Sequence, residues 1–148
     1  MSLLALVDEC RRRQDFRPLC EAIPYARFLG ISVRENTGRL LAELAYQPGN
    51  VGNPTVPALH GGVVGAFLET TAVLELLYTR ESAELPKVIN ITVYYLRPAA
   101  PVTTFAEGVI TRQGRRIANV AVEAWQERRD RLVATANCHF LLPRPPPA

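Results

Sequence analysis

The segment from His60 to Glu69, His-Gly-Gly-Val-Val-Gly-Ala-Phe-Leu-Glu, joins glycines to a single carboxylate in an otherwise apolar stretch. Because glycine has no Cβ, Gly61 and Gly62 allow a ligand to approach the backbone where a helix begins. The first amides of a helix lack partners within it and carry the positive end of its dipole. We expect the Gly61 amide to hold an oxyanion, with Gly62 supporting the turn, although close packing of helix on sheet would also explain both glycines. With Glu69 in reach, the pattern indicates attack on an activated carbonyl.

Glu69 is the central candidate for chemistry. Its helical neighbours three and four positions away are Gly65, Ala66, Ala72 and Val73, none of which can pair with a charge. A buried carboxylate without such a partner is paired elsewhere, protonated or functional. We favour a nucleophile or general base whose pKa burial raises, over a structural acid bonded to a loop or to another subunit.

His60 and a loop asparagine are secondary candidates. His60 lies nine residues before Glu69, half a turn out of phase, so the two share no helix face and form no metal site. We expect His60 to cap or brace the loop before the glycines, with direct substrate contact as the alternative. Asn53, and less strongly Asn50, could offer an amide to a water or a carbonyl, or could serve the turns of the loop itself.

Several arginines predict where phosphates could bind. Arg97 ends an expected strand, and Arg112, Arg115 and Arg116 flank Gly114 at an expected hairpin tip. Guanidinium forks bind phosphates well, although hairpin tips are also commonly charged and solvated. The sequence contains no serine-nucleophile elbow, phosphate-binding P-loop or dinucleotide fingerprint.

The composition bounds the class of protein. The 148 residues are 48% hydrophobic and 21% charged, a composition that predicts one globular domain. The net charge of +3 is too small to indicate binding of nucleic acid. Cys10, Cys20 and Cys138 form no CxxC pair, as expected for reduced thiols. We see neither a signal peptide nor an apolar run of membrane-spanning length, and so expect a cytoplasmic protein without membrane contact.

The elements that must position these residues follow from the apolar periodicity. Residues 3–14 predict a helix, residues 47–59 a loop, and Gly61 to about Thr79 a helix buried on nearly all sides. The expected strands are residues 29–34, 39–46, 87–97, 102–112, 115–127 and 131–142. The first two form a hairpin around Thr37-Gly38, and the last four are joined by connections short enough for an antiparallel meander.

This pattern predicts an α+β fold in which one helix packs on one face of a six-stranded sheet. We expect a single domain over residues 1–142, with residues 1–21 as a helical extension and residues 143–148 as a disordered proline-rich tail. Because one helix cannot cover both faces of such a sheet, we also expect self-association through edge strands or stacked sheets.

The sequence resembles the hotdog-fold thioesterases, specifically the phenylacetic-acid-degradation and 4-hydroxybenzoyl-CoA thioesterase group, over about residues 22–142. The matching pieces are Leu59-His-Gly-Gly62, the acid nine residues after that histidine, Val93-Tyr-Tyr-Leu-Arg-Pro-Ala99, Arg112-Gln-Gly-Arg-Arg116 and Val133-Ala-Thr-Ala136. Glu69 stands where many members have Asp. Asn53 matches the family's loop asparagine only after a shift of one residue, and Val88 replaces a common Ser or Thr.

The resemblance implies a long helix wrapped by a curved antiparallel sheet, and a homodimer that commonly pairs into a tetramer, with its active site between subunits. It implies Glu69 as nucleophile or base, the Gly61 amide as the group that polarises the thioester carbonyl, and coenzyme A as acyl carrier without a metal or cofactor. We therefore expect hydrolysis of an acyl- or aryl-CoA thioester. A dehydratase or hydratase using His60, and a non-catalytic acyl-CoA-binding module, are the alternatives.

Overall fold

Three short helices open the chain in the computed structural model, which describes residues 1–79 and 84–144. They are α1 (Leu3–Arg13), α2 (Arg17–Ala22) and α3 (Pro24–Leu29). The hydroxyl of Ser2 caps α1 by accepting the Ala5 N–H at 3.2 Å, and Pro18 and Pro24 stand in the first turns of α2 and α3, where no N–H is needed. The predicted first helix is thus present, whereas most of the expected tail, residues 145–148, lies outside the described residues.

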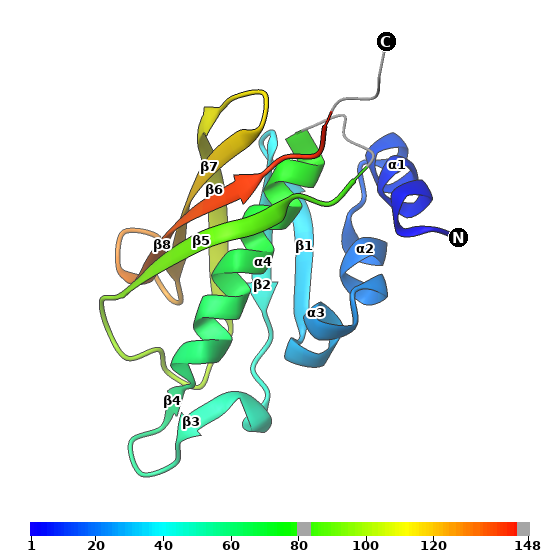
Figure 1. The fold of residues 1–148 in the computed structure, drawn as a ribbon. Helices are drawn as coiled ribbons and strands as arrows, with labels where there is room; N and C mark the ends of the chain where they lie inside the picture. The colour runs from blue at the N-terminus through cyan, green and yellow to red at the C-terminus, as the bar shows by residue number, and fades with distance from the viewer. Residues whose placement is uncertain (80–83, 145–148) are drawn as a thin grey trace.

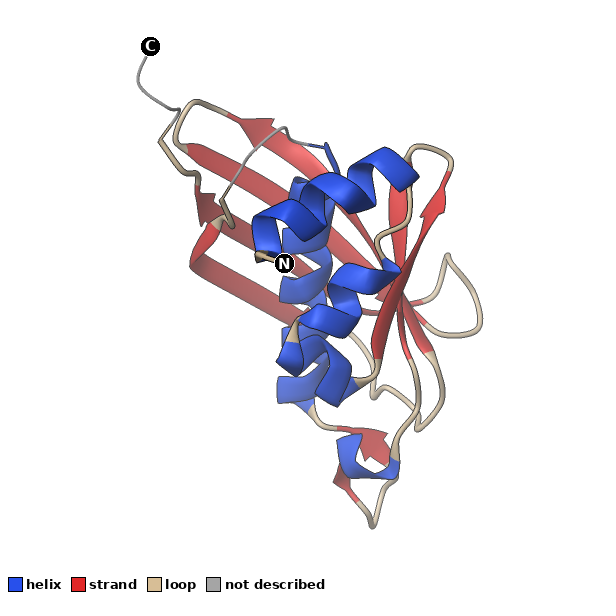
Figure 2. Cartoon of the chain, turned by 90° about the vertical axis from the view of Figure 1, so that its right-hand side faces the viewer, coloured by secondary structure: helices blue, strands red, loops and turns tan. Residues whose placement is uncertain are grey.

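The sheet has six antiparallel strands in the order β1-β2-β6-β7-β8-β5, with α4 (Gly61–Thr79) along its inner face (Figure 1). The strands are β1 (Ile31–Asn36), β2 (Arg39–Leu44), β5 (Lys87–Tyr95), β6 (Thr104–Gln113), β7 (Ile117–Trp125) and β8 (Leu132–Leu141). All the helices gather on one side of this sheet, and α2 and α3 pack along β1 (Figure 2). The structure confirms the α+β fold of one long helix on a curved six-stranded sheet.

The predicted hairpin of β1 and β2 turns at Thr37 and Gly38, whose φ angles are 51° and 80°. Positive φ at both central residues matches the right-handed twist of the strands, and the Glu35 carboxylate accepts the Gly38 N–H at 2.7 Å. The first strand begins later than expected because α3 continues to Leu29 and ends at Gly30, which has a φ of 79°.

The expected meander of the last four strands is wrong in one respect. β6, β7 and β8 are consecutive neighbours, but β5 pairs with β8 at the far edge of the sheet, and β2 occupies the place beside β6. The short proline-rich segment 98–101 is therefore a crossover around the end of the sheet rather than a hairpin turn. The length of a connection limits how far a strand can move but does not decide its neighbour.

Residues 47–59 are also more ordered than the predicted loop. They contain a 3-10 turn, Pro48–Asn50, and a two-stranded hairpin of β3 (Val51–Asn53) and β4 (Ala58–Leu59) at the N-terminal end of α4 (Figure 1). The Asn53 side chain reverses the chain by accepting the N–H groups of Thr55 and Val56 at 3.0 and 3.3 Å.

Helix α4 supplies the centre of the core through buried residues such as Phe67, Leu68 and Leu76. With 19 residues and a mean hydropathy of 1.3 it is also long and apolar enough to cross a membrane, so the expectation that no segment reaches that length is wrong. A core helix meets the same two criteria, and α4 packs against five strands of the sheet.

Candidate active site

The N-terminus of α4 is capped from its own flanking residue. His60 Nδ1 accepts the Gly62 N–H at 2.9 Å, and the His60 N–H donates to the Asn50 carbonyl at 2.8 Å. The Gly61 N–H has no acceptor within residues 1–79 and 84–144. The cap thus uses the amide of Gly62 and leaves that of Gly61 available, at the positive end of the helix dipole.

Tyr95, at the end of β5, lies directly against Gly61. Its hydroxyl donates to the Gly61 carbonyl at 2.7 Å, and a Cβ added at Gly61 would lie 3.4 Å from the tyrosine ring. The absence of a side chain at Gly61 therefore serves close packing against β5 as well as access to the amide. Both functions suggested for this glycine by the sequence are compatible in the same geometry.

Gly61 also lines a cavity of about 340 Å³. Most of its walls are apolar, from residues of β4, α4 and the segment after β5, and Arg97 is the one charged side chain among the described residues that line it. The wall is tied to the strand before α4 because the Leu59 N–H donates to the Ala99 carbonyl at 2.8 Å. A mostly apolar cavity with few polar groups is typical of a small-molecule site.

Glu69 lies two turns inside α4 and is half-buried, rather than buried as the sequence predicted. It follows Gly61 and Gly65 at intervals of four residues, so the three form one ridge of the helix. That ridge faces β5, since a Cβ at Gly65 would lie 3.8 Å from Val93 and 3.5 Å from the Tyr95 hydroxyl. The carboxylate makes no hydrogen bond or ion pair with the part of the chain that the structure describes.

Beneath this ridge, Cys138 of β8 lies close enough to sense the charge of Glu69. Burial, with a smaller contribution from the Glu69 carboxylate, raises the pKa of the Cys138 thiol to about 12. Such a thiol stays protonated and unreactive, so it is no nucleophile. Cys10, Cys20 and Cys138 are all free and buried.

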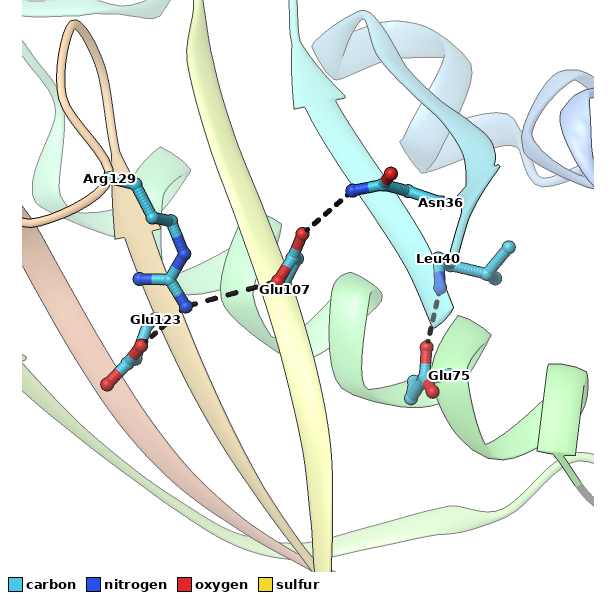
Figure 3. A network of polar contacts seen from close by, with 6 residues as sticks. All are labelled: Asn36, Leu40, Glu75, Glu107, Glu123 and Arg129. Carbon is cyan, nitrogen blue, oxygen red and sulfur yellow. Dashed lines mark hydrogen bonds and ion pairs between the residues drawn. The ribbon is translucent and has the colours of Figure 1, made fainter. Parts of the chain in front are cut away.

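A second acid of α4, Glu75, is the buried one, with 3% of its surface exposed. Its Oε2 accepts the Leu40 N–H at 3.0 Å (Figure 3). Burial raises the pKa of Glu75, while the bond from Leu40 and the charge of Arg39 oppose that rise. Gly108 of β6 leaves room for it, because a Cβ there would lie 3.4 Å from the Glu75 Cβ. Sequence reasoning noted Glu75 only as a charge.

The two asparagines of the preceding loop have separate tasks. Asn53 is exposed and uses its side chain within the β3–β4 turn. Asn50 is 4% exposed and donates from Nδ2 to the Leu29 carbonyl at 3.1 Å, while its own carbonyl holds the His60 amide. Asn50 therefore links the end of α3 to the start of α4 and positions the cap.

The predicted arginines lie at opposite ends of the sheet. Arg97 lines the cavity beside Gly61. In the strand register Tyr95 lies opposite Ala134, near one end, whereas the hairpin that carries Arg112, Arg115 and Arg116 joins β6 and β7 at the other end. Within one chain the structure brings Arg97 to Gly61 and keeps the other three away.

Across residues 1–79 and 84–144, no three His, Cys, Asp or Glu side chains come together in a group that could bind a metal ion.

Comparison with known proteins gives consistent matches over this same region. A family model described as the acyl-CoA thioesterase N-terminal domain matches residues 51–141. A solved structure from Chromobacterium violaceum is 39% identical, with a TM-score of 0.78 over 94% of this chain and 97% of that one.

Two further structures have informative descriptions. A Ralstonia eutropha protein described as phenylacetic acid degradation-related is 25% identical, with a TM-score of 0.73 over 86% of this chain and 98% of that one. A Haemophilus influenzae thioesterase, 21% identical over 86% of this chain and 87% of that one, has a TM-score of 0.75 and shares the fold. No curated protein gives a significant match.

Proposed function

Since this chain belongs to the acyl-CoA thioesterase family and has its hotdog fold, we propose that it hydrolyses an acyl- or aryl-coenzyme A to the free acid and coenzyme A. The observation that carries this proposal is the Gly61 amide, which has no acceptor among the described residues and belongs to the lining of an apolar cavity of about 340 Å³. A thioester presents the matching group, a carbonyl oxygen that becomes negative when the carbon is attacked.

In the proposed reaction the thioester carbonyl accepts the Gly61 N–H, and the helix dipole adds to the stabilisation of the oxyanion. Tyr95 keeps this donor in place through its bond to the Gly61 carbonyl, and His60 fixes the turn by taking the Gly62 N–H. The donor is therefore preorganised, so little rearrangement is needed when charge develops.

Glu69 is the proposed carboxylate. As a general base it would take a proton from the attacking water, and the tetrahedral adduct would expel the thiolate, which then receives that proton. As a nucleophile it would form an acyl anhydride as the C–S bond breaks and the thiolate leaves, and water would then hydrolyse the anhydride, with one proton from that water passing to the thiolate. Either route balances without a metal or cofactor.

The carboxylate that serves one Gly61 comes, in our proposal, from a second copy of the chain. Eight residues separate Gly61 from Glu69, so they lie about 12 Å apart along the axis of the same helix. A two-fold axis near Gly65 would set the partner's Glu69 opposite Gly61. Strand β5 offers the edge for such a pair, because it is paired on one side only and exposes Val88 and Ile89.

We propose a homodimer that pairs again into a tetramer, working in the cytoplasm. The free and buried cysteines suit a reducing compartment. Each assembly step would cover apolar surface that the single chain leaves exposed on β5 and on the outer face of the sheet.

The test is release of free thiol from a panel of short, long and aryl acyl-CoAs. Turnover of any member supports hydrolysis and identifies the acyl class. Tight binding of the whole panel without thiol release would instead establish an acyl-CoA-binding module. Exchange of water at the acyl Cα–Cβ bond without thiol release would establish a hydratase.

Mixing subunits tests the shared site. Glu69→Gln and Gly61→Val variants should each be inactive as homodimers, whereas each mixed dimer should contain one intact site. Random reassociation should therefore restore about a quarter of wild-type activity. Mixed dimers that form, shown by a size tag on one variant, yet stay inactive would contradict a site built from two chains.

A further inference from the structure

A second cavity, of about 460 Å³, adjoins the one at Gly61. The two cavities share Arg97, Pro98 and Val133 among their lining residues, so they lie on either side of the segment that follows β5. The second cavity is otherwise lined by the connection between β7 and β8, and by Ala100 and Val102 of the segment that leads into β6. A ligand with one end at Gly61 could therefore continue past Arg97 into it.

The charge of this second cavity is positive. Arg97, Arg128 and Arg131 line it, against one acid, Glu127. Arg128 is already occupied by a bidentate pair with Asp130, at 3.0 and 2.6 Å. The guanidinium groups of Arg97 and Arg131 make no hydrogen bond or ion pair within residues 1–79 and 84–144. Two uncommitted cations thus line one cavity, an arrangement suited to an anion.

The wall between the cavities is held in a fixed position. The Gln126 side chain accepts the Ala100 N–H at 3.1 Å and donates to the Ala100 carbonyl at 2.8 Å and to the Thr104 hydroxyl at 3.1 Å. On the other side, the Arg97 N–H donates to the Val133 carbonyl at 3.2 Å. The backbones that carry Arg97 and Arg131 are therefore set relative to one another before a ligand arrives.

The side chain of the neighbouring Arg129 is committed to other contacts and does not line the second cavity. Its guanidinium carbon lies 4.2 Å from the centre of the Trp125 ring. The same guanidinium lies 2.7 Å from the Glu123 carboxylate and 3.9 Å from that of Glu107 (Figure 3). These contacts fasten the β7–β8 connection to the sheet. Of the arginines at this connection, Arg131 alone has an uncommitted side chain among the described residues.

We propose that the second cavity binds the diphosphate of coenzyme A, with Arg97 and Arg131 as its ligands. The inference rests on the proposed function, because it assumes that the thioester binds at Gly61 and that the pantetheine arm passes through the first cavity. It differs from the sequence-based prediction for Arg112, Arg115 and Arg116, which lie at the other end of the same chain and could reach this ligand only from another subunit.

The experiment is calorimetric titration of the intact protein with coenzyme A and with pantetheine, which lacks the diphosphate. Arg131→Gln should raise the Kd for coenzyme A by about 10-fold or more, as expected for loss of a charge-assisted hydrogen bond, and leave the Kd for pantetheine unchanged. Arg131→Lys should recover part of the loss. Arg34→Gln, an exposed arginine of β1, is the charge-matched control, and Arg115→Gln represents the rival site.

The possible results separate the two proposals. Weaker coenzyme A binding in Arg115→Gln but not in Arg131→Gln would overturn the inference, as would equal losses in Arg131→Gln and Arg34→Gln, or no binding of coenzyme A by the wild type. Arg131-dependent binding in a protein that releases no thiol from any acyl-CoA would support the cavity and refute hydrolysis. Thiol release with Arg131-independent binding would do the reverse.

Discussion

The two halves of α4 contain the same residue types and have opposite surroundings. In the first half the Gly61 amide has no acceptor among the described residues, and Glu69 is half-buried without a partner there. In the second half Glu75 is buried and bonded to Leu40, and the Leu77 carbonyl accepts Arg11 Nε at 3.0 Å. One end of the helix is open to a cavity, and the other is closed by polar contacts from α1 and β2.

The comparison teaches that a carboxylate in an apolar helix is not functional by position alone. Glu75 has a backbone N–H within reach because the β1–β2 hairpin brings Leu40 against the helix. Glu69 faces the edge strand β5, where no described group bonds to it. Glu75 therefore has a structural explanation, whereas Glu69 has no bonding partner among the described residues.

Replacing each acid by its amide should give the largest difference in activity between the two halves of α4. Glu69→Gln should lower kcat for thiol release by about 100- to 10,000-fold, the range for loss of a general acid or base, with little change in Tm. Glu75→Gln should keep kcat within a few-fold of wild type. Comparable losses of kcat in both variants would show that the acids are not distinguished as their surroundings suggest.

Replacing each acid by leucine should reverse the order of the effects, with stability as the measurement. Glu75→Leu leaves the buried Leu40 N–H without an acceptor, which should cost about 1–3 kcal/mol in urea unfolding. Glu69→Leu removes no bond to a described residue and should cost less. A larger loss of stability at Glu69 would indicate a structural partner for that carboxylate in the assembled protein.

The pH dependence of unfolding should carry the signature of Glu75. Its pKa in the folded protein is raised above the ordinary value of 4.5, so it binds its proton more tightly when folded. Its contribution to stability is therefore full below about pH 4.5 and is lost as pH rises through the folded pKa. Glu75→Gln should flatten this part of the stability profile, whereas Glu69→Gln should leave it in place.

The smallest effects are expected at the caps of the two ends. His60→Ala removes the acceptor of the Gly62 N–H and should cost about 1 kcal/mol, with His60→Asn restoring part of it. Arg11→Met removes the donor to Leu77 at the other end. Only the His60 change should also raise the KM for an acyl-CoA, because only that cap adjoins the cavity. An equal change of KM in both variants would contradict the contrast between an open and a closed end of α4.

Much of the fold could be read from the sequence because the decisive signals are local. The Gly-Gly pair and the apolar run fix α4, and Thr37-Gly38 fixes the first hairpin. The place of β5 could not be read, because strand order depends on which surfaces pack together across the sheet. Asn53 serves the turn of its own loop, one of the two roles that the sequence allowed, because its backbone partners lie only two and three residues away.

Local geometry around Gly61 could be predicted where a single segment determines it, whereas contacts between two segments were missed. Gly61, and the capping interpretation of His60, depend on the start of one helix. Tyr95 and Arg131 become neighbours of the cavities through the pairing of β5 with β8, which no local pattern encodes. The roles of Glu69, Gly61 and the hairpin arginines in catalysis and binding stay predictions.

The place of β5 at the far edge also has a consequence for how the chain folds. Short turns allow β6, β7 and β8 to pair in succession. Strand β5 can pair only after β8 has been synthesised, many residues later. Contacts between residues far apart in the sequence form slowly because a long loop must close first, so we expect β5 to join the sheet late. A nascent or truncated chain that lacks β8 would then hold a formed α4 with no Tyr95 against it. The cavity would be completed near the end of folding.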